Sequence, residues 1–86
     1  MEEISIEEFK EKNGNVMAGV STSNTQYYDL GNGKLGVVGE TERGARAYRL
    51  SPSSYFNGEK RVEDSSSFSG DLKTSDPVEE AEEWLS

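Results

Sequence analysis

The sequence predicts an α+β protein: a small antiparallel β-meander or partial barrel of four or five strands, with a short N-terminal helix and a marginal C-terminal helix. Between Asn15 and Val62, turn-forming residues recur about every eight to twelve positions, a spacing typical of an antiparallel meander. Helix-starting motifs stand on both sides of this stretch, at Ser5 and at Asp76. The 86 residues allow one domain at most.

The N-terminal helix is predicted over residues 6–13. Ser5 caps it, and Glu8 three residues later completes a capping box. Two turns of helix are too short to be stable alone, so we expect this helix to dock on the sheet through Ile6 and Phe9.

The middle of the chain predicts the strands of the meander. They are expected at residues 16–21, 25–30, 35–40 and 45–50, and more weakly around 54–56 and 59–62. The segment GNGK joins the second strand to the third, and TERG joins the third to the fourth. Asn57-Gly58 suits a type I′ turn, because that turn needs positive φ at both central residues. Residues 1–62 are therefore expected to form one globular domain.

The amino-acid composition of the sequence changes after Val62. Residues 63–77 are rich in Ser, Asp and Gly, which predicts a loop or linker. Asp76 then suits a helix N-cap, with Pro77 at the first helical position. Residues 78–86 are predicted to form an acidic helix or tail, marginal unless another part of the fold receives Trp84.

The net charge of −8 is concentrated at the two ends of the chain. Residues 1–13 carry −3, residues 14–62 carry +2, and residues 63–86 carry −7. Such a protein is repelled by nucleic acid and by anionic membranes and attracted to basic protein surfaces. The acidic N-terminus has no apolar signal segment, and no apolar run is long enough to cross a bilayer, so we expect a cytoplasmic location, in a host cell if the chain is viral.

The glycine spacing of the segment LGNGKLGVV raises the question of nucleotide binding. With Gly31, Gly33, Gly36 and Val38, it resembles the glycine-rich loop of protein kinases, itself a β-hairpin over ATP phosphates. The resemblance covers about 21 residues and ends there, since the chain has no H-R-D and no D-F-G motif. A tight turn and close strand packing explain the same glycines.

The sequence is poorly supplied for catalysis, so we expect no enzyme, no cofactor and no metal site. It contains no histidine and no cysteine, which removes the usual general base and the thiolate nucleophile. The acidic pairs near the C-terminus are expected on an exposed helix, and the Asp-containing loops hold only parts of a calcium motif.

One alternative is a small barrel that binds single-stranded nucleic acid weakly. Arg43, Arg46 and Arg49 alternate with aromatic residues, as in proteins that combine a charge track with base stacking. The segment EEAEEWLS is similar to the acidic tails of bacterial single-stranded-DNA-binding proteins, which implies an autoinhibitory tail. Alternation nevertheless places Arg46 and Arg49 on opposite faces of their strand.

The favoured hypothesis is a non-enzymatic acidic protein that inhibits or regulates a nucleic-acid-handling protein by engaging its basic surface. It resembles, in type only, the small acidic inhibitors made by phages and plasmids, some of which mimic nucleic acid. A structural subunit that pairs through a sheet edge remains a further alternative, and self-association stays open. The expected partner-binding residues are Asp64, Asp71, Asp76, Glu79, Glu80, Glu82, Glu83 and Trp84.

Overall fold

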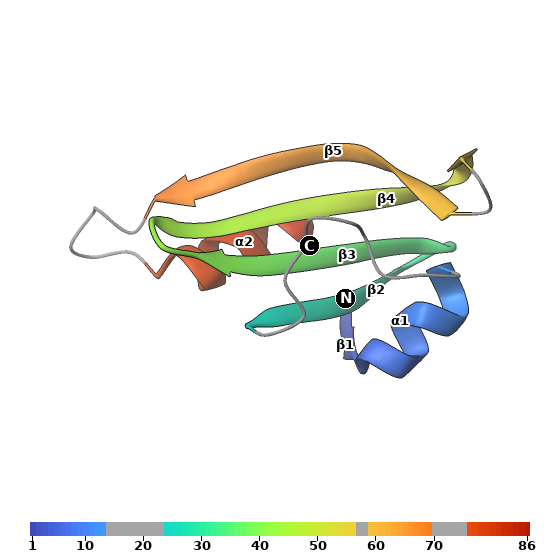
Figure 1. Cartoon of the computed structure of the whole chain (residues 1–86), viewed down its shortest axis with the longest axis horizontal. Helices are drawn as coiled ribbons and strands as arrows, with labels where there is room; N and C mark the ends of the chain where they lie inside the picture. Colours follow the sequence, from blue (N-terminus) through green and yellow to red (C-terminus); the bar gives the residue numbers. More distant parts are fainter. Residues whose placement is uncertain (14–23, 57–58, 70–75) are drawn as a thin grey trace.

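A computed structural model describes residues 1–13, 24–56, 59–69 and 76–86, and it confirms the α+β fold (Figure 1). One open sheet of five antiparallel strands has the order β1-β2-β3-β4-β5, so each strand pairs with the next strand of the chain. The elements are β1 (Glu2–Ile4), α1 (Ile6–Asn13), β2 (Thr25–Gly31), β3 (Lys34–Thr41), β4 (Gly44–Phe56), β5 (Glu59–Ser69) and α2 (Pro77–Leu85).

Helix α1 forms as its local sequence predicts. The backbone N–H of Glu8 donates to Oγ of Ser5 over 3.1 Å, which is the expected cap. Phe9 is fully buried, and its ring lies 4.6 Å from that of Tyr27 on β2. Ile6 packs against the same core, so the predicted docking of the helix through Ile6 and Phe9 is confirmed.

The β2–β3 hairpin uses two of the three motif glycines for backbone geometry. Gly31 and Gly33 have positive φ angles of 86° and 79°, and Asn32 between them has φ 55°. Asn32-Gly33 thus has the positive φ at both central residues that a type I′ turn requires. The Gly31 N–H donates to Asp29 Oδ1 over 2.9 Å, which holds the pKa of the Asp29 carboxyl below its usual value, and Lys12 at 3.4 Å lowers it further.

Three parts of the sheet differ from the predicted strands. Strand β4 spans both strands predicted at 45–50 and around 54–56. The three-residue β1, which pairs with β2, was not expected from the sequence. The loop or linker predicted over residues 63–77 is wrong for residues 63–69, which continue β5 along β4. Pairing with the regular strand β4 holds this serine-rich segment extended. The strand predicted at 16–21 and the turn at Asn57-Gly58 lie outside the described residues.

Alternation along the strands gives the sheet two apolar faces. The α1 side gathers Ile4, Phe9, Tyr27, Leu35, Val37 and Leu50. The α2 side gathers Tyr28, Val38, Ala45, Ala47, Ala81 and Leu85. Each helix thus covers one face, with α1 beside β2 and α2 across β3, β4 and β5 (Figure 1).

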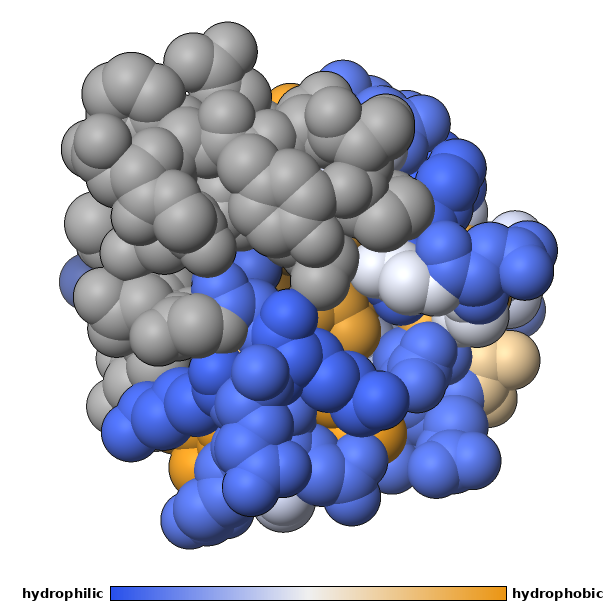
Figure 2. Space-filling model, turned by 90° about the vertical axis from the view of Figure 1, so that its right-hand side faces the viewer, coloured by the Kyte–Doolittle hydropathy of each residue, from blue (hydrophilic) through white to orange (hydrophobic). Residues whose placement is uncertain are grey.

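The end of the molecule that carries α1 and the β2–β3 turn presents a mainly hydrophilic surface in its described part (Figure 2). No helix among the described residues has the length and apolar content that crossing a membrane requires.

Candidate functional site

The candidate site is built on α2, which begins as the sequence predicts. The Asp76 side chain accepts hydrogen bonds from the backbone N–H groups of Val78, at 3.0 Å, and Glu79, at 3.4 Å. Pro77 occupies the first turn, where its missing N–H costs nothing. The Asp76 carboxylate is therefore the N-cap of α2.

Small side chains let α2 lie close to the sheet. Ala81 is fully buried and Leu85 nearly so, on the face that also contains Val38 and Ala47. Gly36 lies directly beneath Leu85, because a Cβ built there would stand 3.1 Å from its Cδ1 atom. The third glycine of the kinase-like motif is therefore explained by helix packing.

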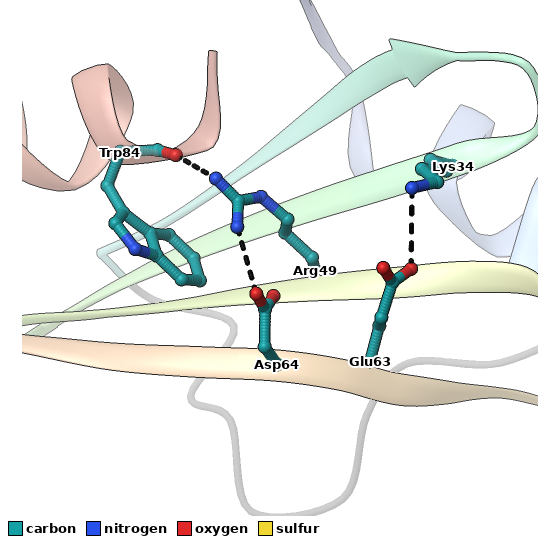
Figure 3. A network of polar contacts seen from close by, with 5 residues as sticks. All are labelled: Lys34, Arg49, Glu63, Asp64 and Trp84. Atoms are coloured by element: carbon teal, nitrogen blue, oxygen red, sulfur yellow. Dashed lines mark hydrogen bonds and ion pairs between the residues drawn. The ribbon is translucent and has the colours of Figure 1, made fainter.

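Arg49 of β4 joins the sheet to the C-terminal end of α2 (Figure 3). Its guanidinium carbon lies 3.9 Å from the centroid of the Trp84 ring, a close cation–π contact. One guanidinium nitrogen donates to the backbone carbonyl of Trp84, and the other donates to Asp64 Oδ2 over 2.9 Å. The Trp84 indole also meets Phe68 edge to face, with centroids 6.3 Å apart. Trp84 is thus held against the sheet by β4 and β5.

Arg49 offsets an unfavourable distribution of charge at the C-terminal end of α2. The last turn of α2 contains no basic residue and does contain Glu82 and Glu83, which oppose the negative end of the helix dipole. Arg49 brings a positive charge to this end from another element, 35 residues away from Trp84 in sequence. The helix is therefore stabilised by a contact that its own sequence does not provide.

Glu82 faces the sheet and not the solvent side of α2. The Tyr28 hydroxyl donates to Gln26 Oε1 over 2.7 Å. Burial raises the pKa of Tyr28 far above its usual range, and the nearby negative charge of Glu82 raises it further. Glu82 is therefore engaged with the β2 surface.

The outward side of α2 carries Glu79, Glu80 and Glu83, which we call the acidic face. Glu79 and Glu83 are exposed and lie one helical turn apart, while Glu80 is half-buried. The three ion pairs within the described residues are Lys12–Asp29, Lys34–Glu63 and Arg49–Asp64. None of them uses a carboxylate of the acidic face, and two of its three carboxylates, Glu79 and Glu83, are exposed.

The structure places the partner-binding residues expected from the sequence in different environments. Asp64 pairs with Arg49, Asp76 caps α2, and Trp84 packs within the fold. Asp71 lies outside the described residues. The acidic face keeps three of the predicted carboxylates together, whereas Trp84 as an anchor for a partner stays a prediction.

Arg49 is the structurally important residue that the sequence analysis did not assign to this region. The last turn of α2 has no basic residue, which indicated that a cation from elsewhere would stabilise it. Nothing in the sequence identified the residue that supplies this cation. A second cross-strand pair, Lys34–Glu63 at 3.5 Å, lies nearby along β3 and β5 (Figure 3).

The arginine and aromatic residues of the middle segment do not share one surface. Arg49 points to α2, whereas Arg46 lies on the other face, 5.9 Å from the Tyr48 ring. Tyr27 and Tyr28 are both buried and unable to stack on a base. A continuous track of charge and stacking rings is therefore not formed by these residues.

Comparisons with protein-family models, with curated proteins and with solved structures find no match to this chain.

Proposed function

We propose that this protein is a non-enzymatic binding protein whose acidic face engages a basic surface on a nucleic-acid-handling protein and thereby inhibits or regulates it. The observation that carries the proposal is the set of three carboxylates, Glu79, Glu80 and Glu83, which form no ion pair with any described residue and lie on the outer side of a docked helix.

The arrangement of these carboxylates costs stability, which supports a role outside the fold. Like charges one helical turn apart, as at Glu79 and Glu83, destabilise a helix by about 0.2–0.5 kcal/mol. Glu83 also lies near the negative end of the helix dipole. A docked helix fixes the backbone positions of these carboxylates, so binding costs little backbone entropy, as a mimic of nucleic acid requires.

Binding to a panel of purified basic DNA- and RNA-binding proteins, with an acidic protein for comparison, tests the proposal. We expect binding to at least one basic protein to weaken as salt rises, because exposed charges are screened. The variant E79Q/E80Q/E83Q should bind roughly 3- to 150-fold more weakly, since three exposed ion pairs contribute about 0.2–1 kcal/mol each.

The matched control is E7Q/E8Q/E11Q on α1, which removes the same charge from three exposed glutamates of the other helix. Gln at position 8 still suits the capping box. This control should retain binding. Equal binding by both triple variants would place the site away from the acidic face and contradict the proposal.

A further inference from the structure

Two arginines form no ion pair within the described part of this strongly acidic chain. The sequence contains 17 acidic residues against nine basic ones, so a carboxylate partner is abundant. Lys12, Lys34 and Arg49 each pair with a carboxylate. Arg43 and Arg46 do not, and both guanidinium groups therefore keep donors available for a ligand.

Both arginines line the same pocket, a hollow of about 430 Å³. It lies where the β3–β4 turn meets the end of β5, at the end of the sheet opposite α1 (Figure 1). Hydroxyl groups of Thr41, Ser67 and Ser69 complete the polar lining. The residues that line the pocket therefore include two arginines and three residues with hydroxyl groups.

The strand register explains why Arg46 and the three hydroxyl-bearing residues lie on the same face of the sheet. Gly44 pairs with both Thr41 and Ser69, so these three residues form one row across the sheet. Arg46 pairs with Ser67 in the next row on the same face, two residues along each strand. Gly44, between Thr41 and Ser69, contributes no side chain to this row.

The two other lining residues, Ala45 and Phe68, belong to the α2 side of the sheet. They pair with each other and pack into the core beneath α2. No carboxylate is among the described residues that line the pocket.

We propose that this pocket binds a phosphate group, either as free phosphate or on a small phosphomonoester. Each guanidinium offers a planar fork of donors that matches two phosphate oxygens, and two guanidinium charges balance a phosphate dianion. The hydroxyls of Thr41 and Ser67 offer donors to the remaining oxygens. The Tyr48 ring, 5.9 Å from the Arg46 guanidinium, limits the directions in which that side chain extends.

An NMR titration of the full chain with inorganic phosphate tests this site. We expect saturable shifts at the backbone amides of Thr41, Arg43, Arg46, Ser67 and Ser69. Sodium acetate at the same ionic strength should give none that saturate. A titration with adenosine monophosphate distinguishes these two ligands. If it binds more tightly than inorganic phosphate, the site is for a phosphomonoester, and if it binds equally, the site is for the free anion. Both results support the site.

Variants decide whether the two arginines are responsible. R43Q/R46Q should weaken phosphate binding at least about tenfold, and R46K should weaken it less, because lysine keeps the charge and loses the fork. K10Q is the control, since it removes an exposed positive charge from α1. E42Q, in the β3–β4 turn, should strengthen binding modestly by removing a nearby negative charge.

Three results would overturn the proposal: shifts that follow ionic strength without saturating, shifts equally produced by acetate, or unchanged phosphate affinity in R43Q/R46Q. The unaffected amides in the variant spectrum report whether its fold is intact. The site is independent of the acidic face, so E79Q/E80Q/E83Q should bind phosphate like the wild type even if its binding to basic proteins is lost.

Discussion

Gly36 is a residue at which the sheet and α2 approach closely. A Cβ at this position would lie 3.1 Å from Leu85 Cδ1 and 3.2 Å from Leu30 Cδ2. Such contacts are tighter than side chains normally accept, so even one added methyl group requires both leucines to move. Gly31 differs, since it has open space around it and is needed for its φ of +86°.

Gly36→Val should therefore destabilise the protein by about 1–3 kcal/mol, the usual cost of overpacking a core. The bulk displaces Leu85, so the fluorescence of Trp84, one residue earlier, should shift toward that of an exposed indole. Urea unfolding and the emission spectrum measure the two effects.

Gly31→Ala provides the comparison for this prediction. It should cost about 1 kcal/mol, because alanine is strained at positive φ, and it should leave the Trp84 emission unchanged. If Gly36→Val kept both the stability and the emission of the wild type, Gly36 would not be required for the docking of α2.

At the scale of the elements, α2 depends on the sheet for its C-terminal stability. Arg49→Met removes the stacking on Trp84 and the donor to its carbonyl while keeping most of the side-chain bulk. We expect a loss of about 1–2 kcal/mol, since a desolvated cation–π contact contributes up to about 2 kcal/mol. Hydrogen exchange should accelerate in α2 more than in the β2–β3 hairpin.

Asp64→Asn separates the ion pair from the stacking. The Asp64 side chain is 47% exposed, so its pair with Arg49 is screened by water and should contribute less than about 1 kcal/mol. If Asp64→Asn destabilised the protein as much as Arg49→Met, the ion pair and not the Trp84 contact would hold α2.

The elements that could be predicted from the sequence are those determined by nearby residues. Helix α1 follows from Ser5 and Glu8 within one turn, and α2 begins at an Asp-Pro step that fixes its cap. Strands β2 and β3 follow from the turn-forming residues that bound them, including the turn between them.

The elements that were missed depend on distant partners. The serine-rich end of β5 is extended because Ser65, Ser66 and Ser67 pair in register with β4, which no local propensity records. The short β1 depends in the same way on β2. For the site, the carboxylates of α2 were predictable from composition, whereas the contact of Arg49 with Trp84 spans 35 residues and required the tertiary fold.

At the scale of the whole molecule, the two helices differ in net charge, because α1 combines three glutamates with two lysines whereas α2 has four glutamates and no basic residue. Each has a pair of exposed glutamates one turn apart, Glu7 and Glu11 on α1 and Glu79 and Glu83 on α2. On α1, Lys10 and Lys12 lie near the second glutamate of the pair. The last turn of α2 contains no base, so its negative potential is less compensated.

This difference separates a binding face from a face that only keeps the protein soluble. In E79Q/E83Q, repulsion between the two carboxylates is removed, so stability at low salt should rise by about 0.2–0.5 kcal/mol, and the gain should disappear at high salt. E7Q/E11Q should gain less, because lysines already offset the charge of α1. Only E79Q/E83Q should also lose affinity for a basic protein, a trade of binding for stability that is common at functional sites. A purely solvating face would gain the same stability and lose no binding, so denaturation curves and binding isotherms of the same two variants decide between the two roles.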